Sequence, residues 1–213
     1  MGSCYRFLDA NPGETVLMSI KNEGERDKPI DGLVQQEIDA HAARWYTETA
    51  IPKLGNGRGD GGCRGKVVLF RRYATAHALR GIDVGSIWPD NTQQEGLKNN
   101  DGQLFSIQDE YKNYVLSELD HKFINHVRPY LKTVPGTQFI NFTSGMGSTG
   151  GFVFPKTLAK GEESFSTFRG TNYLLYRYLL DKVTATYGII AMDFPEYPGE
   201  SLIPMIISTN NFR

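Results

Sequence analysis

The sequence lacks the features that mark membrane-spanning, nucleic-acid-binding or disulfide-rich proteins. None of its apolar runs approaches the roughly 18 residues that a membrane-spanning helix needs, although 39% of its 213 residues are hydrophobic. Its 23 basic and 24 acidic residues form no long block of one sign, which excludes the electrostatic footprint of a nucleic-acid binder. Its two cysteines, Cys4 and Cys63, have no metal-ligand spacing and predict neither a disulfide framework nor a zinc site.

The length of the chain favours one domain over residues 1–213. A chain of 213 residues with this hydrophobic content can bury a single sizeable core. The first residues, Met1 to Arg6, lack the charged-then-apolar pattern of a secretion signal. Composition alone leaves the cellular compartment open.

Segments typical of strands and of helices alternate along the chain. The run Thr15–Lys21 is almost continuously apolar, which predicts a strand buried on both faces of a parallel sheet. Further strands are predicted at Lys66–Tyr73, Phe105–Tyr111, Gln138–Ser144 and Gly188–Asp193. Apolar residues at helical spacing predict helices at Asp31–Ala50 and Asn172–Tyr187, and a long helix that carries Val115, Leu119, Phe123, Val127 and Leu131. This alternation predicts an α/β fold with parallel strands and helical crossovers.

Each predicted strand ends near a polar or charged residue. In chain order these residues are Lys21, Arg72, Asp109 with Tyr111, Asn141 with Ser144, and Asp193. In a parallel α/β barrel the active site gathers at the C-terminal ends of the strands. The set suits a polyhydroxylated or phosphorylated ligand, because cations bind phosphate while carboxylates and a phenol bind hydroxyl groups. The alternative interpretation is that these residues form salt bridges at a solvated rim.

Six segments carry a resemblance to a known family. In chain order they are Phe7–Lys21 (FLDANPGETVLMSIK), Gly65–Tyr73 (GKVVLFRRY), Ile87–Asn91 (IWPDN), Ile107–Tyr111 (IQDEY), Phe139–Ser144 (FINFTS) and Ile190–Asp193 (IAMD). The chain resembles the C-terminal two thirds of the X domain of bacterial-type phosphatidylinositol-specific phospholipases C. The segments follow the family's order over nearly the whole chain.

The resemblance implies a distorted TIM-type barrel that cleaves phosphatidylinositol without a metal ion or other cofactor. Such an enzyme transfers the phosphate to the inositol 2-hydroxyl and releases diacylglycerol and a cyclic inositol phosphate. Two histidines act as general base and general acid, an arginine stabilises the phosphate charge, and an aspartate orients the base. By position, Asp193 matches the orienting aspartate, while Lys21, Arg72, Asp109 and Tyr111 match residues of the inositol pocket. The implied partner is an inositol phospholipid at a membrane surface, met by a secreted or peripheral protein.

The chain departs from the family at its most reactive residues. The family carries both histidines and the phosphate-binding arginine in Gly-Thr-His-Asp, Asp-Ile-Arg and His-His-Gly type motifs, and none of these occurs in this sequence. General acid–base catalysis contributes roughly 10²- to 10⁴-fold per group. We therefore expect an incomplete barrel of about five of the eight βα units, a truncated form that is inactive on its own.

The four histidines present do not suggest a replacement pair. His41 falls on the apolar face of a predicted helix, where a core or interface histidine is expected. His121 and His126 are five residues apart on one predicted helix, so they are expected to point in different directions. His77 follows the strand that ends at Arg72, but no second histidine is placed opposite it.

Two other classes of function stay open. One is a non-catalytic module that binds inositol or phospholipid through the pocket residues. The other is a metal-dependent barrel of the glycerophosphodiesterase type, which needs a carboxylate cluster that the sequence does not show. In the Gly- and Phe-rich stretch 145–170, Phe152 and Phe154 are candidates for membrane contact, because aromatic rings favour the lipid interface. Ordinary packing of both rings beneath the loop is the alternative.

Overall fold

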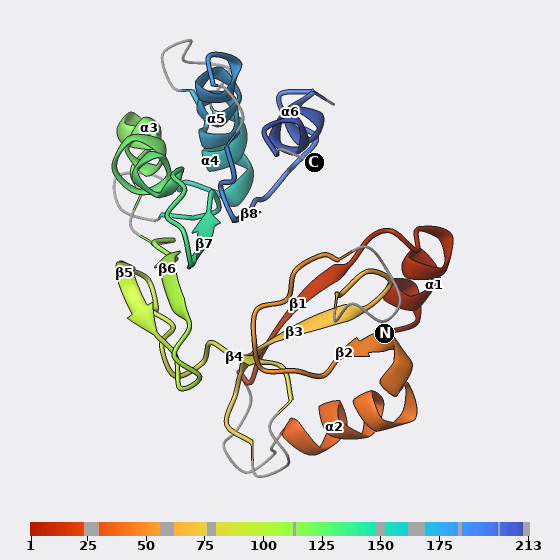
Figure 1. Cartoon of the computed structure of the whole chain (residues 1–213). Coiled ribbons are helices and arrows are strands. Elements are labelled where there is room, and N and C mark those ends of the chain that lie inside the picture. Colours follow the sequence, from red (N-terminus) through yellow and green to blue (C-terminus); the bar gives the residue numbers. More distant parts are fainter. Residues whose placement is uncertain are drawn as a thin grey trace. The chain divides into compact units, whose positions relative to one another are not determined.

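The protein is described here from a computed structural model. The structure describes residues 1–23, 30–55, 62–75, 80–112, 114–147, 152–161, 169–182, 185–199 and 201–210. The chain divides into two compact units (Figure 1). Unit 1 comprises Met1–Trp88 with Lys98–Gln103, and unit 2 comprises Pro89–Leu97 with Leu104–Arg213. Among the described residues, no helix is both long enough and apolar enough to cross a membrane.

Unit 1 is built around strand β3, Val67–Arg72. Strand β1, Val16–Lys21, pairs with β3 over its whole length. The short strands β2, Trp45–Tyr46, and β4, Ile82–Asp83, pair with the start and the end of β3 respectively. All three pairings are parallel, as the sequence predicts for β1 and β3. Because β3 is the shared partner, all four of its apolar residues, Val67 to Phe70, are buried.

Helices cover one face of this sheet. Helix α1, Gly2–Ala10, contributes Leu8, and helix α2, Asp31–Ala40, contributes Val34 and Ile38. These side chains pack against Val67 and Leu69 of β3. Successive side chains of a strand point to opposite faces, so we call the face that carries Val67 and Leu69 the α2 face. The other face carries Val68, Phe70 and Arg72.

Unit 2 holds most of a second sheet in the order β5-β6-β7-β8. Its strands are β5, Gln93–Lys98; β6, Leu104–Gln108; β7, Thr137–Phe142; and β8, Ile189–Ala191. The pairings of β6 with β7 and of β7 with β8 are parallel. Strand β5 is joined to β6 by the short loop 99–103, a connection typical of antiparallel neighbours.

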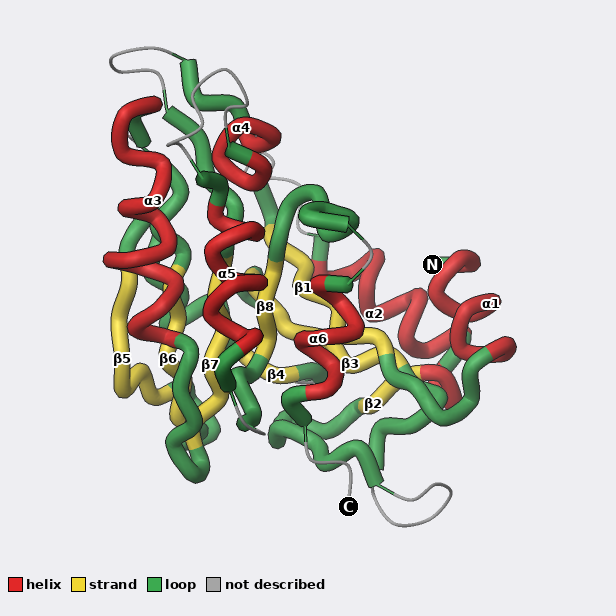
Figure 2. Tube along the Cα trace, turned by 90° about the horizontal axis from the view of Figure 1, so that it is seen from above, coloured by secondary structure: helices red, strands yellow, loops and turns green. Residues whose placement is uncertain are grey.

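One side of the second sheet is covered by helices (Figure 2). The first is a continuous helical stretch that consists of η2 (Leu116–Glu118), α3 (Leu119–His121), η3 (Lys122–Val127) and η4 (Arg128–Tyr130). The others are α5 (Thr171–Leu180) and α6 (Leu202–Ser208). Phe123, Val127, Leu175 and Leu202 form the centre of this layer. Helix α4, Pro155–Lys160, buries Leu158 in a smaller cluster with Leu119.

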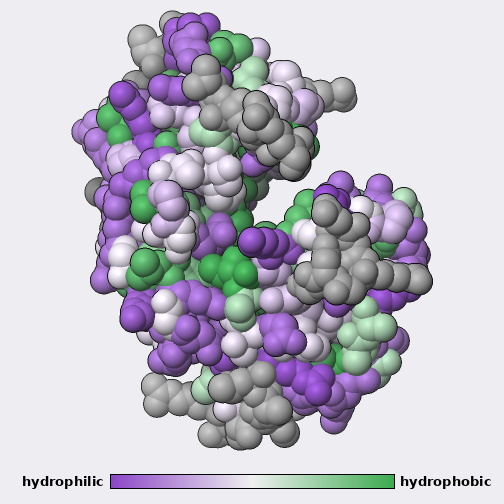
Figure 3. Space-filling view, in the orientation of Figure 1, coloured by the Kyte–Doolittle hydropathy of each residue, from purple (hydrophilic) through white to green (hydrophobic). Residues whose placement is uncertain are grey.

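The α/β class is confirmed, whereas a barrel is not seen among the described strands. The structure contains two four-stranded sheets, and neither closes on itself. The surface visible in Figure 3 is mostly hydrophilic, with hydrophobic side chains in small groups between the polar ones. This is the pattern expected for a water-exposed α/β protein.

Several predicted elements differ in length or environment. The helix predicted over 31–50 ends at Ala40, because Trp45 and Tyr46 instead form β2 beside Val67 and Val68. Strand β1 alternates half-buried and exposed residues, so the prediction of burial on both faces was wrong: Leu17 keeps 46% exposure. The physical reason is that β1 ends the sheet and only its α2 face is covered.

The long amphipathic helix predicted near 115–131 is one helical stretch of mixed geometry. It passes from a 3₁₀ turn into a short α-helix, then into the π-helix Lys122–Val127 and a final 3₁₀ turn that contains Pro129. Helices α1, α4 and α6 and strands β2, β4 and β5 were not predicted from the sequence.

Candidate functional site

In unit 1 the structure brings Lys21 and Arg72 together. They are the last residues of β1 and β3, and they are partners in the parallel register. Val16, Met18 and Ile20 of β1 pack on the α2 face, so alternation places Lys21 on the opposite face, together with Arg72. Two cations therefore end neighbouring strands on the same face of the sheet.

Each of these cations is held by a neighbouring side chain. Nζ of Lys21 lies 3.0 Å from a carboxylate oxygen of Glu23, and the Lys21 side chain is 42% exposed. The Arg72 guanidinium lies 3.7 Å from the centre of the Trp88 ring, a cation–π arrangement that fixes its plane. Sequence reasoning gives Trp88 no role beyond its place in the segment Ile87–Asn91, and the structure places it against Arg72.

In unit 2 Asp109 and Tyr111 directly follow β6. Asp109 is 8% exposed, and its backbone N–H donates to the Thr92 carbonyl at 2.9 Å. The Tyr111 hydroxyl donates to Asp90 at 3.3 Å, and its backbone N–H donates to the Asn91 side chain at 3.1 Å. The segments Ile87–Asn91 and Ile107–Tyr111 are thus physically tied, although they are remote in sequence.

Asp193 follows β8 and is held through its backbone. Its carbonyl accepts a hydrogen bond from the buried amide of Asn172 at 2.8 Å, and the same amide reaches the Phe194 carbonyl at 3.0 Å. Because β6, β7 and β8 are parallel neighbours, Asp109, Tyr111 and Asp193 all follow the C-terminal edge of one sheet. Unit 2 therefore gathers two carboxylates and a phenol at this edge.

Asn141 does not belong to this set, so the prediction that it lines the mouth was wrong. Its side chain is fully buried, and its amide donates to the Val127 carbonyl at 2.9 Å. Asn141 thus faces the helical layer and stabilises the packing of η3 on β7. Its position near a strand end could not reveal which face it occupies.

The histidines differ from the predictions in two places. His41 lies just beyond α2 and is about half exposed, with Nε2 3.8 Å from Glu37 and its ring 5.1 Å from that of Tyr5. It is therefore not a core residue. His121 and His126 line one small cleft of about 190 Å³. The intervening π-helix widens the turn, so residues five apart come to the same side. His77 lies outside the described residues.

The two histidines of this cleft have separate partners. Nδ1 of His121 lies 3.2 Å from Glu118, and Nδ1 of His126 lies 3.1 Å from the side-chain oxygen of Gln93. Burial, followed by the charges of Lys122 and His121, lowers the pKa of His126. The cleft is accordingly a polar groove beside η3.

Sequence reasoning missed Lys122, which is fully buried in the π-helix. Its Nζ donates to the Glu110 carbonyl and lies 5.7 Å from the centre of the Tyr114 ring. Burial lowers its pKa to about 7, while the charges of Glu110 and Asp109 act in the opposite direction. The only feature of the sequence that could have indicated a buried lysine is the position of Lys122 within an apolar helical pattern.

Phe152 and Phe154 are both exposed. Their side chains have relative exposures of 74% and 62%, and their rings stack with centres 6.0 Å apart and planes 17° apart. The rings therefore pack on each other at the surface and are not buried beneath the loop. Within the part of the chain that the structure describes, no three His, Cys, Asp or Glu side chains are grouped to hold a metal ion.

No family model matches the chain. The architecture is that of bacterial phosphatidylinositol-specific phospholipases C. A Staphylococcus aureus structure is 23% identical with a TM-score of 0.72, covering 99% of this chain and 70% of that one. The Listeria monocytogenes enzyme is 21% identical with a TM-score of 0.64, covering 99% of this chain and 69% of that one.

Curated relatives carry a more specific name. Two Staphylococcus aureus proteins, from strains Newman and NCTC 8325, are called 1-phosphatidylinositol phosphodiesterase. Each is 29% identical over 119 residues, which make up 51% of this chain and 36% or 34% of the relative. The match thus spans little more than a third of the length of these relatives. In sequence and in fold the chain is similar to bacterial phosphatidylinositol-specific phospholipases C, the family that its six segments resemble.

Proposed function

We propose that this chain is the inositol-binding part of a phosphatidylinositol phosphodiesterase of the bacterial phospholipase C type. The observation that carries this proposal is the shared face and register of Lys21 and Arg72, two cations at the strand ends where such barrels bind their ligands. The names of the curated relatives support the substrate class.

In this proposal residues 1–213 form one domain, an incomplete TIM-type barrel. Lys21 and Arg72 bind the oxygen atoms of the inositol headgroup as charged donors. Asp109 accepts hydrogen bonds from the ring hydroxyls, and Tyr111 covers one face of the sugar with its ring. Asp193 holds the general-base histidine in its reactive orientation, as the corresponding aspartate of the family is expected to do.

The proposed reaction moves the phosphate group from the diacylglycerol oxygen to the inositol 2-hydroxyl. A base removes the proton of that hydroxyl, and an acid gives a proton to the departing glycerol oxygen. None of the four histidines of these 213 residues stands in the family's catalytic motifs. We therefore propose that this chain alone is inactive and that it contributes the pocket and Asp193, while a histidine-bearing segment supplies the acid and the base.

Complementation tests this proposal. Phosphatidylinositol cleavage is measured for this chain alone and for the chain mixed with an N-terminal fragment of the Staphylococcus aureus relative. We expect turnover only in the mixture, and we expect Asp193→Asn to abolish most of it while Asp181→Asn, a matched change on a surface carboxylate, does not. Cleavage by the chain alone would contradict the proposed inactivity. If the chain is folded and the mixture still does not cleave phosphatidylinositol, the proposal that this chain contributes the pocket and Asp193 is contradicted.

A binding module is the second candidate, because the pocket residues are present without the family's histidine motifs. Calorimetric titration with inositol 1-phosphate separates the two functions. If the folded chain binds inositol 1-phosphate and the mixture does not cleave phosphatidylinositol, the chain is a binding module. A barrel of the glycerophosphodiesterase type would instead lose its activity when a chelator removes the metal ion.

We further propose that Phe152 and Phe154 touch the membrane that carries the substrate. Their stacked rings are exposed at 74% and 62%, and exposed aromatic rings gain free energy at the lipid interface. One solved Staphylococcus aureus phosphatidylinositol-specific phospholipase C belongs to a study of how its membrane binding is modulated. Binding to phosphatidylinositol vesicles tests this contact.

A further inference from the structure

Asn172 is a buried polar residue of unit 2 to which the proposed reaction assigns no role. It lies in the first turn of α5, and its side chain has no exposure. A polar side chain at such a place needs hydrogen-bond partners to offset its desolvation. Its amide nitrogen donates to the carbonyls of Asp193 at 2.8 Å and of Phe194 at 3.0 Å. Both N–H groups of this amide therefore bind the backbone of one short segment.

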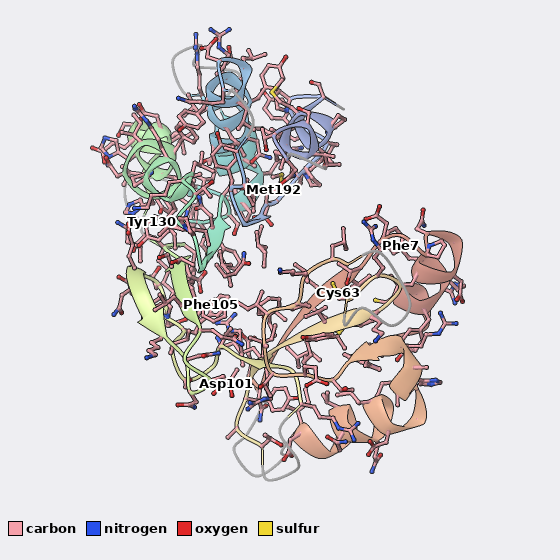
Figure 4. All side chains as sticks on the ribbon, in the orientation of Figure 1. Phe7, Cys63, Asp101, Phe105, Tyr130 and Met192 are labelled. Carbon is pink, nitrogen blue, oxygen red and sulfur yellow. The ribbon has the colours of Figure 1, made fainter. Side chains whose placement is uncertain are left out.

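The segment that Asn172 contacts contains the residue proposed to orient the general base. The Asp193 carbonyl group is bonded to the same Cα that carries the Asp193 side chain, so fixing this carbonyl restricts where the side chain begins. On the other side of Asp193, Met192 packs against the helical layer that contains Leu175 (Figure 4). The backbone at Asp193 is thus held from both directions along the chain.

Phe194 has a backbone conformation that needs support. Its φ is 52°, in the left-handed region that residues other than glycine seldom adopt. Such a conformation persists only where the surrounding structure fixes it. The Phe194 carbonyl accepts from Asn172 and from the Tyr197 backbone N–H, the latter at 3.0 Å. Asn172 therefore holds the first residue of a turn that begins directly after Asp193.

Thr143 determines which way the Asn172 amide points. It directly follows β7, is 1% exposed, and its backbone N–H donates to the Ala191 carbonyl at 2.9 Å. Its hydroxyl donates to Oδ1 of Asn172 at 3.3 Å, closer than the Ala191 carbonyl at 3.5 Å. Because the oxygen of the amide faces Thr143, its nitrogen faces the carbonyls of Asp193 and Phe194. The network therefore links β7, β8 and α5 around one amide.

A second contact reaches the same turn from the protein surface. Nζ of Lys160, the last residue of α4, lies 5.6 Å from the centre of the Phe194 ring and 5.4 Å from that of the Tyr197 ring. It also lies 3.9 Å from a carboxylate oxygen of Glu196, and the Lys160 side chain is 30% exposed. Interactions of exposed charges are weak. The buried amide of Asn172 is therefore the stronger of the two restraints on this turn.

We propose that Asn172 is a positioning residue that fixes Asp193 in the orientation needed for catalysis, with Thr143 orienting its amide. This inference rests on the proposed function, in which Asp193 holds the general-base histidine. A general base must lie within hydrogen-bond reach of the proton that it removes, and a displacement of about 1 Å can lower the rate by roughly 10²-fold. Asn172 acts on the reaction through Asp193, without contact with the substrate.

Hydrogen exchange of the chain by itself, measured by NMR, tests the structural part of this proposal. The Tyr197 amide is the reporter, because its N–H is bonded to the Phe194 carbonyl. In Asn172→Ala we expect its exchange to accelerate at least about tenfold relative to that of the Ile140 amide in β7, which reports global opening. The control Asn141→Ala removes an equally buried amide on the helical side of β7 and leaves this ratio unchanged. An unchanged ratio in Asn172→Ala overturns the proposal.

Thr143→Val provides a milder second variant that keeps Asn172 itself. It removes the hydroxyl that faces Oδ1 of Asn172. We expect the Tyr197 amide to exchange at least about threefold faster, a smaller factor than in Asn172→Ala, because the amide loses its orientation but keeps both donors. Should Asn172→Ala not fold, this variant decides the matter, and unchanged exchange at Tyr197 overturns the proposal.

Turnover of phosphatidylinositol by the complemented mixture tests the catalytic part. We expect Asn172→Ala to lower kcat at least about tenfold and to leave KM unchanged, because orientation of the base is lost while substrate binding is kept. The control Asn141→Ala keeps kcat. Combined with Asp193→Asn, Asn172→Ala should cause no further loss, since the two residues act as a unit.

The outcomes separate this inference from the proposed function on which it rests. Additive losses in the double variant, or full turnover in Asn172→Ala, overturn the positioning role and leave the proposed function standing. A wild-type mixture without turnover refutes the proposed function itself and, with it, the catalytic role of Asn172.

Discussion

Among the described residues, each of the two units buries one cationic side chain, and the two cations are treated differently. Arg71 of unit 1 is 6% exposed and Lys122 of unit 2 is fully buried. Lys122 can lose its proton, and burial lowers its pKa to about 7. Arg71 cannot, because a guanidinium keeps its charge. A buried lysine can avoid the free-energy cost of desolvating its charge by losing its proton. A buried arginine keeps its charge, so only hydrogen bonds or a nearby anion can offset that cost.

The units also differ at the C-terminal edges of their sheets. Unit 1 presents two cations there, Lys21 and Arg72, while unit 2 presents Asp109, Tyr111 and Asp193. The same parallel architecture thus places donors in one unit and acceptors in the other.

Truncating a core side chain is expected to have the largest effect, because it removes buried apolar contacts that stabilise one of the two units. Leu69→Ala in unit 1 and Leu175→Ala in unit 2 each replace a side chain with at most 1% exposure. Each is expected to cost about 2–5 kcal/mol in the free energy of unfolding, measured by urea titration. The control Leu180→Ala, at a residue that is 46% exposed, should change the value by less than about 0.5 kcal/mol. Equal costs for Leu175 and Leu180 would contradict the assigned core.

The titration of Lys122 sharpens the comparison between the two buried cations. In the unfolded chain this lysine holds its proton up to its ordinary pKa of 10.5, whereas in the folded protein it releases the proton at about 7. Between these values the unfolded state binds more protons, so stability rises with pH. The slope is up to roughly 1.4 kcal/mol per pH unit.

Urea unfolding at about pH 7.5 and about pH 9 measures that slope. We expect Lys122→Met to remove it, because the titrating group is gone. Arg71→Met is expected to leave the slope unchanged, since the guanidinium does not titrate in this range. A slope that persists in Lys122→Met would show that another group titrates between these two pH values.

Substitution of Arg72 tests the proposed role of the unit 1 edge. Arg72→Lys keeps the charge but loses the planar fork and the stacking on Trp88. We expect inositol 1-phosphate to bind about tenfold more weakly, with the exposed Lys53→Ala as a control that leaves the affinity unchanged. Calorimetric titration measures the affinity. An unchanged affinity in Arg72→Lys would contradict the proposed role of Arg72 in binding the headgroup.

Replacing the stacked phenylalanines is expected to have an effect no larger than that of Arg72→Lys. The double change Phe152→Ser and Phe154→Ser removes the apolar area proposed to enter the lipid interface. Sedimentation with phosphatidylinositol vesicles should show binding weakened by about tenfold. Ile207→Ser, at another apolar side chain with 52% exposure, serves as the matched control. Equal losses in both variants would indicate general surface hydrophobicity and no specific contact.

Local sequence patterns predicted the centres of the elements better than their ends. The apolar and β-branched runs located β1, β3, β6, β7 and β8, because strand formation there follows from burial of short hydrophobic segments. Strand β2 was missed, since two residues carry no periodicity and Trp45 and Tyr46 are strand residues only through pairing with β3. The π-helix was missed for a similar reason, because its geometry depends on packing around Lys122.

The sequence by itself determined the α/β class, the resemblance to bacterial phosphatidylinositol-specific phospholipases C, and the placement of Lys21, Arg72, Asp109, Tyr111 and Asp193 at or just after strand ends. These follow from local order along the chain. The tertiary structure alone decided that Asn141 faces the helices, that His121 and His126 share a cleft, and that Arg71 is buried with its Nε lacking a hydrogen-bond partner. These depend on which face of a strand or helix is covered, and that is settled by pairing between segments far apart in sequence.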